Sequence, residues 1–142
     1  MPRSIVVGTD GSQQAERALD EAIAIAERDG AQLHVVTAFP DPALIRERIT
    51  SGATAARVNL SQVADSVLNR AAERAGAKGV EAHTHASEAD PAEAILQLAG
   101  EVNADLIVVG SRGLSGIKRF LMGSVSSKVS EHATCSVMIV RD

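Results

Sequence analysis

Short apolar runs rich in β-branched residues alternate along the chain with longer segments in which apolar residues recur every three or four positions. Runs of the first kind are typical of strands and cover residues 4–9, 32–37, 80–86, 106–110 and 136–140. Segments of the second kind indicate amphipathic helices and cover residues 15–26, 63–76, 90–102 and about 124–133. The pattern therefore predicts strands and helices in strict alternation.

The third helical segment has the clearest start. Asp90 can cap free backbone amides, Pro91 suits the first helical position, and Glu93 stands where a capping box requires it. The stretch 39–56 has little pattern, and we expect a loop there with a short helix over 43–49.

Strands separated by helices pair in parallel through right-handed crossovers, and the apolar runs IVV and LIVV suit strands that are covered on both faces. We predict one α/β domain over residues 1–142. It is a three-layer open sheet of five parallel strands in the order 3-2-1-4-5, with helices on both faces.

Composition narrows the function classes. Of 142 residues, 45% are hydrophobic and 23% charged, which is typical of globular proteins, and a single Cys, Cys135, excludes an internal disulfide. A net charge of −4 and only two aromatic residues argue against a nucleic-acid partner. The start carries no signal-like apolar stretch and no run is long enough to cross a bilayer, so we expect a cytoplasmic protein without a membrane partner.

A glycine-rich segment follows the fourth predicted strand. Gly110 and Gly113 let the backbone turn off the strand close to a ligand, and Gly123 and Ser124 begin a helix whose first amides lack internal partners. A phosphate can satisfy those amides, with hydroxyl hydrogen bonds from Ser124 and Ser126. The alternative is a plain turn followed by a helix capped by Ser124.

Asp10 follows the first predicted strand, at the sheet end where parallel α/β proteins bind ligands. It can contact a ligand there, or it can accept hydrogen bonds from the helix start at Ser12 and Gln13. Its position favours the ligand role.

Gly110, Gly113, Gly123 and Ser124 together match the pattern G-x2-G-x9-G-(S/T) without a gap. In this pattern, and in VVGTDGS, QLHVVTAF, DPAEAILQLAGEVNADLIVVGSRG and CSVMIV, the chain resembles the ATP-binding branch of the universal stress proteins. The resemblance spans nearly the whole chain. It implies a cytoplasmic ATP-binding sensor or switch of the stress response, with Mg or Mn held through the phosphates.

The resemblance also implies a set of nucleotide-binding residues. Asp10 would face the ribose and base and could contribute to the metal ion, while Gly8 and Ala38 would line the adenine pocket. The implied positions are Gly8, Thr9, Asp10, Ala38, Gly110, Ser111, Arg112, Gly113, Gly123, Ser124, Val125 and Ser126.

Two alternatives use the same pocket: a slow ATPase or phosphotransferase, and a sensor of AMP or cyclic AMP. The sequence has no Gly-x-Gly and no G-K-(S/T), which removes the Rossmann fingerprint and the P-loop lysine. Fast phosphoryl transfer is therefore disfavoured, because it needs dense positive charge near the γ-phosphate.

The histidines give a weaker signal. His83 and His85 stand two apart on one face of a predicted strand, a spacing that can bind metal, but no third ligand is evident and an ordinary edge strand is the favoured interpretation. His34 and His132 are interpreted as isolated.

The last strand, residues 136–140, is apolar and carries no charge before Arg141. As a sheet edge it invites antiparallel pairing with a second copy. The resemblance also implies a homodimer through this strand, and the alternative is an edge protected by Arg141, Asp142 and the preceding helix.

Overall fold

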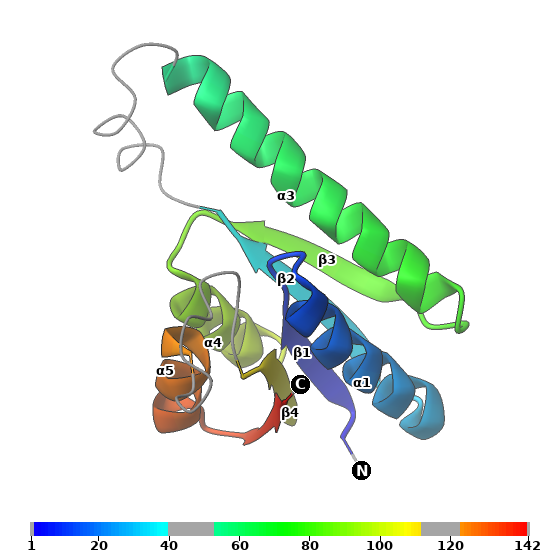
Figure 1. Cartoon of the computed structure of the whole chain (residues 1–142). Coiled ribbons are helices and arrows are strands. Elements are labelled where there is room, and N and C mark those ends of the chain that lie inside the picture. The colour runs from blue at the N-terminus through cyan, green and yellow to red at the C-terminus, as the bar shows by residue number, and fades with distance from the viewer. Residues whose placement is uncertain (1, 40–52, 112–122, 142) are drawn as a thin grey trace.

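The computed structural model describes residues 2–39, 53–111 and 123–141. Strands and helices alternate along the described chain, as the hydrophobic pattern predicts (Figure 1). In chain order the elements are β1 (Ser4–Gly8), α1 (Gln13–Asp29), β2 (Gln32–Ala38), α3 (Ala53–Gly76), β3 (Ala82–Ser87), α4 (Pro91–Glu101), β4 (Leu106–Gly110), α5 (Ser124–His132) and β5 (Ser136–Val140).

The five strands form one parallel sheet in the order β3-β2-β1-β4-β5, which confirms the predicted fold class and strand order. The order reverses at β1, because the chain adds β2 and β3 on one side of it and β4 and β5 on the other. Val7 of β1 pairs with Val35 of β2 and with Val108 of β4. The three central strands are buried because helices cover both of their faces.

Two apolar layers flank the sheet. Ile5 and Val7 point to the face covered by α1 and α3, whereas Val6, between them, points to the face covered by α4 and α5. Small residues of α1, among them Ala18 and Ala22, are fully buried and let that helix lie close to the sheet. The alternation of side chains along each strand thus builds both cores.

Two helix starts follow the local signals in the sequence. Ser12 caps α1, its Oγ accepting a hydrogen bond from the backbone N–H of Ala15 at 3.2 Å. Asp90 caps α4 by accepting from the backbone N–H of Glu93, with Pro91 at the first helical position, as predicted. At the other end of α1, Gly30 adopts a left-handed conformation with φ of 67°, which a glycine adopts without strain.

Helix α3 is longer than its apolar periodicity indicates. It begins at Ala53, upstream of Val63 and inside the stretch expected to be a loop, which is therefore shorter than predicted. Ala53, Ala55 and Ala56 are strong helix formers, which favours a helix over this start. The short helix expected over 43–49 lies outside the described residues.

No helix in the described part of the chain is long and apolar enough to cross a membrane.

Candidate functional site

The carboxyl ends of β1 and β4 lie side by side where the strand order reverses, since β1 and β4 are direct neighbours in the sheet. Ligands of open parallel sheets bind beyond the strand ends at such a position. The loops after Gly8 and Gly110 both leave the sheet here, so the fold brings the two predicted halves of the site together.

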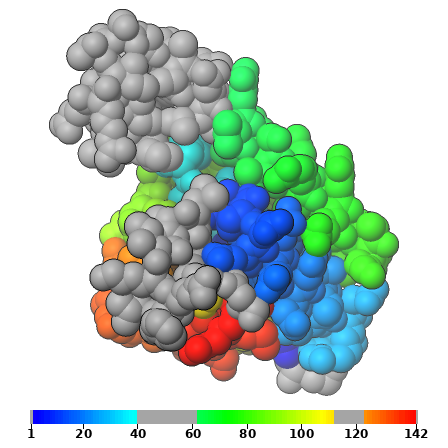
Figure 2. Space-filling view, in the orientation of Figure 1, coloured from blue at the N-terminus to red at the C-terminus, as the bar shows by residue number. Residues whose placement is uncertain are grey.

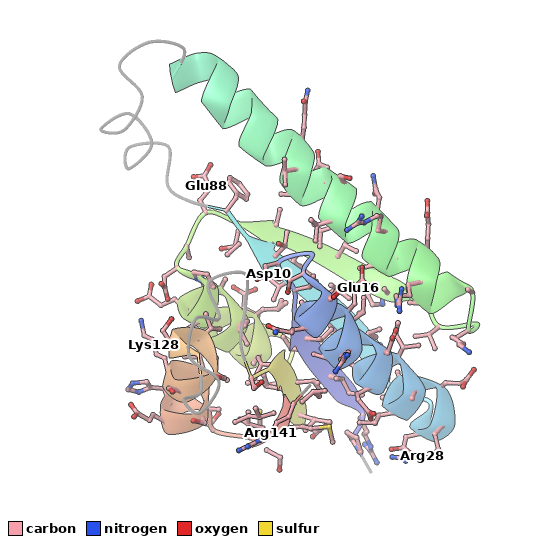
Figure 3. All side chains as sticks on the ribbon, in the orientation of Figure 1. Asp10, Glu16, Arg28, Glu88, Lys128 and Arg141 are labelled. Carbon is pink, nitrogen blue, oxygen red and sulfur yellow. The ribbon has the colours of Figure 1, made fainter. Side chains whose placement is uncertain are left out.

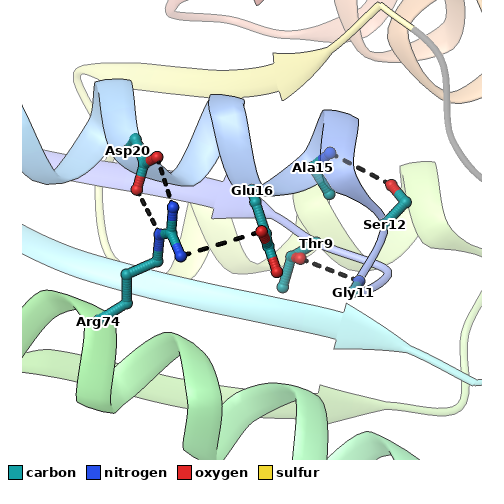
Figure 4. Close-up of polar contacts among 7 residues, drawn as sticks. All are labelled: Thr9, Gly11, Ser12, Ala15, Glu16, Asp20 and Arg74. Carbon is teal, nitrogen blue, oxygen red and sulfur yellow. Dashed lines mark hydrogen bonds and ion pairs between the residues drawn. The ribbon is translucent and has the colours of Figure 1, made fainter.

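The loop after β1 is held by short local hydrogen bonds. The backbone N–H of Thr9 donates to the Val36 carbonyl at 3.0 Å, and Thr9 Oγ1 accepts from the backbone N–H of Gly11 at 3.1 Å (Figure 4). Asp10 is exposed at the tip of this loop, where Figure 3 labels it, and its Oδ1 accepts from the backbone N–H of Ser12 at 2.9 Å. Asp10 therefore makes the turn contact that was its alternative role, which leaves its ligand role a prediction.

The chain leaving β4 is joined directly to the chain entering α5. The Ser111 carbonyl accepts hydrogen bonds from the backbone N–H of Gly123 at 2.6 Å and from Ser126 Oγ at 3.3 Å. The backbone N–H of Ser111 in turn donates to the Val140 carbonyl at 2.9 Å. These contacts fix the start of α5 beside the end of β4.

Ser126 has a structural part in this junction. It is 1% exposed, and its hydroxyl lies 3.0 Å from the Gly123 carbonyl as well as close to that of Ser111. Its single hydroxyl proton is directed to backbone carbonyls of the junction. Ser124, by contrast, is exposed at the first position of α5.

Helix α5 begins without a side-chain cap in the described part of the chain, unlike α1 and α4. Its cap residue is Gly123, not Ser124, so the alternative in which Ser124 caps the helix is not what the structure has. Gly123 has φ of −62° and ψ of 160°, a conformation open to any residue. Within the described residues no side chain caps the amides at this helix start, and amides of this kind can bind an anion.

The adenine-side positions lie at the ends of β1 and β2. Ala38 is half-buried against the α4 side of the sheet, and the next residue, Phe39, donates its backbone N–H to the Ser87 carbonyl at 3.0 Å. Gly8 packs against α4 so closely that an added Cβ would lie 2.5 Å from Ile95 Cδ1. Arg112 and Gly113 lie outside the described residues.

A cavity that the sequence did not indicate lies behind the β1 loop, between α1 and α3. It has a volume of about 360 Å³, and its walls include Thr9, Gly11, Glu16, Arg70 and Arg74. Figure 2 shows the start of α1 and the α3 surface adjoining on this face. The sequence holds one signal for contact between these two helices. Two acidic residues, Glu16 and Asp20, stand four apart on one helix, and two basic residues, Arg70 and Arg74, stand four apart on the other.

Arg74 closes one side of this cavity. Its Nε and Nη2 donate to the two carboxylate oxygens of Asp20 at 2.5 and 2.8 Å, and Glu16 Oε2 lies 3.9 Å from its Nη1 (Figure 4). The hydrogen bond from Arg74 lowers the pKa of Asp20, and the bond to Asp20 raises the pKa of Arg74. The pair therefore remains charged across the physiological pH range.

Known proteins resemble the chain over its whole length. The model of the "Universal stress protein family" matches residues 1–141. The universal stress protein YxiE of Bacillus subtilis is 36% identical over 148 residues, covering 99% of this chain and all of that protein.

Two solved structures extend the likeness to three dimensions. A universal stress protein in complex with cAMP is 35% identical, covers 99% of this chain and 97% of its own, and has a TM-score of 0.74. A universal stress protein of Archaeoglobus fulgidus in complex with dAMP is 27% identical over 96% of each chain, with a TM-score of 0.70. Sequence and fold agree, and the chain belongs to the universal stress protein family.

Proposed function

We propose that this chain binds an adenine nucleotide across the ends of β1 and β4 and works as a nucleotide-dependent switch. The nucleotide that we assign is ATP. The observation that carries the proposal is the junction of Ser111 with Gly123, which holds the uncapped start of α5 next to the strand-order reversal. A helix start presents amide donors and about half a positive charge, a favourable place for phosphate.

Glycine at position 123 supports the phosphate role. Its φ and ψ are accessible to every residue, so the backbone conformation does not require a glycine there. A ligand that approaches the amides of Ser124 and Val125 does benefit from the missing side chain. Ser124, exposed at the first position, adds a hydroxyl donor.

The base and ribose would lie toward Gly8, Asp10 and Ala38, at the ends of β1 and β2. The relatives solved with cAMP and with dAMP support an adenine nucleotide as the ligand class. The finer choice of ATP rests on the glycine pattern from Gly110 to Ser124. Mg²⁺ or Mn²⁺ would be held mainly by the phosphates, with the exposed Asp10 carboxylate as the nearest protein oxygen donor in our assignment.

The first experiment identifies the ligand. Freshly purified protein is denatured, and the released nucleotide is identified by mass spectrometry; calorimetry with ATP, AMP and cyclic AMP then ranks the three affinities. We expect ATP to be released and to bind most tightly. A preference for AMP or cyclic AMP would retain the assignment of the pocket and replace ATP as the nucleotide that the protein senses. No binding of any of the three would overturn the proposal.

A variant pair tests the site. Gly123→Val places a branched side chain at the amides while keeping an allowed backbone conformation, so nucleotide affinity should fall at least about tenfold with the fold retained. Gly100→Val is the matched control, because a Cβ at Gly100 would meet nothing within 4 Å and the position is exposed near the end of α4, outside the proposed site. Unchanged ATP affinity in folded Gly123→Val would exclude this phosphate site.

Turnover separates the switch from the enzyme alternative. A switch should keep ATP through purification or hydrolyse it far more slowly than the ~1 to 10³ per second of typical enzymes. Steady turnover in that range that is lost in Asp10→Ala would favour the ATPase instead.

A further inference from the structure

Three histidines from two neighbouring strands form a cluster that the nucleotide site does not use. His34 Nδ1 of β2 lies 3.2 Å from His85 Nε2 of β3, and the rings of His34 and His83 stack with centroids 5.1 Å apart and planes at 28°. The interpretation of His34 as isolated is therefore wrong. The cause is the parallel register, which pairs His34 with His83 directly and Val36 with His85.

The cluster lies on the α4 side of the sheet, on the same face as Val36. Helix α4 packs there against β1 and β2, so the cluster sits beside that helix at the edge strand. The three histidines differ in solvent exposure: His34 is 8% exposed, His85 is half-buried and His83 is exposed. Protons from solvent reach the cluster, yet its inner member is shielded from water.

The short nitrogen–nitrogen contact carries one proton at a time. One ring must donate an N–H and the other must offer its lone pair, so the contact survives with either none or one of the two rings charged. When both rings are charged, both nitrogens carry hydrogen and two donors face each other. The second protonation therefore breaks this side-chain hydrogen bond, while the backbone pairing of β2 with β3 does not depend on it.

The surroundings oppose that second charge. His34 Nε2 is buried without a hydrogen-bond partner in the described part of the chain, so a charged His34 would hold a buried N–H with no acceptor. Burial lowers the pKa of His34, and His83 and His85 lower it further. Burial and then His83 also lower the pKa of His85, while the carboxylate of Glu101, at the end of α4, acts in the opposite direction.

The charged groups that act on the cluster from the described residues are thus its own imidazoles and Glu101 of α4. Helices α1 and α3 cover the opposite face of the sheet. No group of three or more His, Cys, Asp or Glu side chains within the described ranges is arranged to hold a metal ion. The chemistry that the contacts of the cluster support is proton binding.

We propose that His34, His83 and His85 form a proton-sensitive clasp that adds to the backbone pairing of edge strand β3 with β2 at neutral pH and is lost on mild acidification. The device belongs to the fold and does not depend on the nucleotide assignment. Strand β3 is suited to this change because it is an edge of the sheet, and in the described part of the chain β2 is its only strand neighbour.

The direction of the pH dependence follows from the linkage between proton binding and folding. Folding lowers the pKa of His34 and His85, so below the ordinary histidine pKa of about 6.5 the unfolded or opened chain binds more protons than the closed one. The stabilisation is complete above that pH and is lost as the pH falls through the folded-state pKa values. Acid should therefore open β3 before it unfolds the rest of the chain.

Hydrogen–deuterium exchange of the full chain tests the clasp, with EDTA present to exclude adventitious metal. Uptake by peptides covering 82–87 is compared at about pH 7.5 and about pH 5 after correction for intrinsic exchange rates. We expect the corrected opening of β3 to rise several-fold at the lower pH, while peptides from β1 and β4 change little. Equal protection of β3 at both pH values would overturn the proposal.

Variants assign the effect to the cluster. His85→Gln keeps a polar group of similar reach that does not titrate, and it should flatten the pH dependence of β3 opening; His34→Leu should do the same by removing the buried ring. His132→Gln, at an exposed position at the end of α5, is the matched control and should retain the wild-type pH dependence. A wild-type pH dependence in folded His85→Gln would refute the clasp even if His34→Leu did not fold.

Discussion

At the scale of single residues, Gly8 shows how packing and binding meet at one position. The residue ends β1 beneath the proposed adenine pocket, and it also packs closely against Ile95 of α4. Ile95, 4% exposed, occupies the space that a side chain on Gly8 would need. A side chain on Gly8 would force Ile95 to shift, so the core favours glycine here whether or not a ligand is bound.

A double-mutant cycle tests this requirement. Gly8→Ala should lower the free energy of unfolding by about 1–3 kcal/mol, because the new methyl group overlaps Ile95 Cδ1. Ile95→Val removes that terminal carbon and should recover part of the loss when the two changes are combined. Urea denaturation of the four proteins measures the coupling; strictly additive losses would mean that Ile95 is not the obstacle.

The role of Ser126 could not be predicted from the sequence. The glycine pattern indicates where phosphate should approach, and it does not distinguish a serine that faces the ligand from one that ties the loop together. That difference depends on the contact between Ser126 and the carbonyl of Ser111, fifteen residues earlier in the chain. A contact at that range follows from the fold and has no local signature.

At the scale of elements, an ion pair at the protein surface joins α1 to α3. The Arg74–Asp20 ion pair is bidentate, but both side chains are about half exposed, at 45% and 50%. Water and salt screen such a pair, which limits what it contributes. Its role is to fix how the two helices lie over the cavity behind the β1 loop.

Asp20→Asn removes the charge and keeps an oxygen acceptor. We expect a loss of about 0.2–1 kcal/mol in the free energy of unfolding at low salt, most of which should vanish near 1 M salt. Because Arg74 lowers the pKa of Asp20, the contribution is present above the ordinary Asp pKa of about 3.9 and is lost as the pH falls through the folded-state value. Glu21→Gln, at an exposed neighbouring position, should cost less; an equal loss in both would attribute the effect to net charge alone.

Sequence periodicity was sufficient to predict the strands and helices and their order along the chain. It was insufficient to predict the register between neighbouring strands. The apolar runs IVV and LIVV are buried on both faces, so their place in the centre of the sheet follows from composition. His34 and His85 are 51 residues apart, and only the β2–β3 register makes them neighbours. The length of α3 was also missed, because the prediction began this helix at Val63 whereas the helix begins at Ala53.

At the scale of the whole molecule, the open edge at β5 bears on assembly. Strand β5 pairs with β4 along one side, and within the described residues no strand covers its other side. Val137 and Ile139 pack toward the α4 and α5 side of the sheet, while Met138 and Val140 pack toward α1, and all four stay partly exposed. Figure 2 shows the C-terminal end of the chain at the molecular surface.

We predict a two-fold dimer in which β5 of one copy pairs antiparallel with β5 of another. Such pairing would satisfy the open backbone groups of the edge and bury apolar side chains that are now partly exposed on both faces. Met138→Lys and Ile139→Lys, one on each face, should each shift the protein toward monomer in sedimentation equilibrium. Ser130→Lys adds the same charge at an exposed position of α5 and should leave the dimer unchanged.

Circular dichroism identifies variants that remain folded, since a lysine forced into either core would unfold the chain for unrelated reasons. If folded variants on both faces sediment as the unmodified protein does, β5 is not the interface, and the exposed edge must be protected within a single copy.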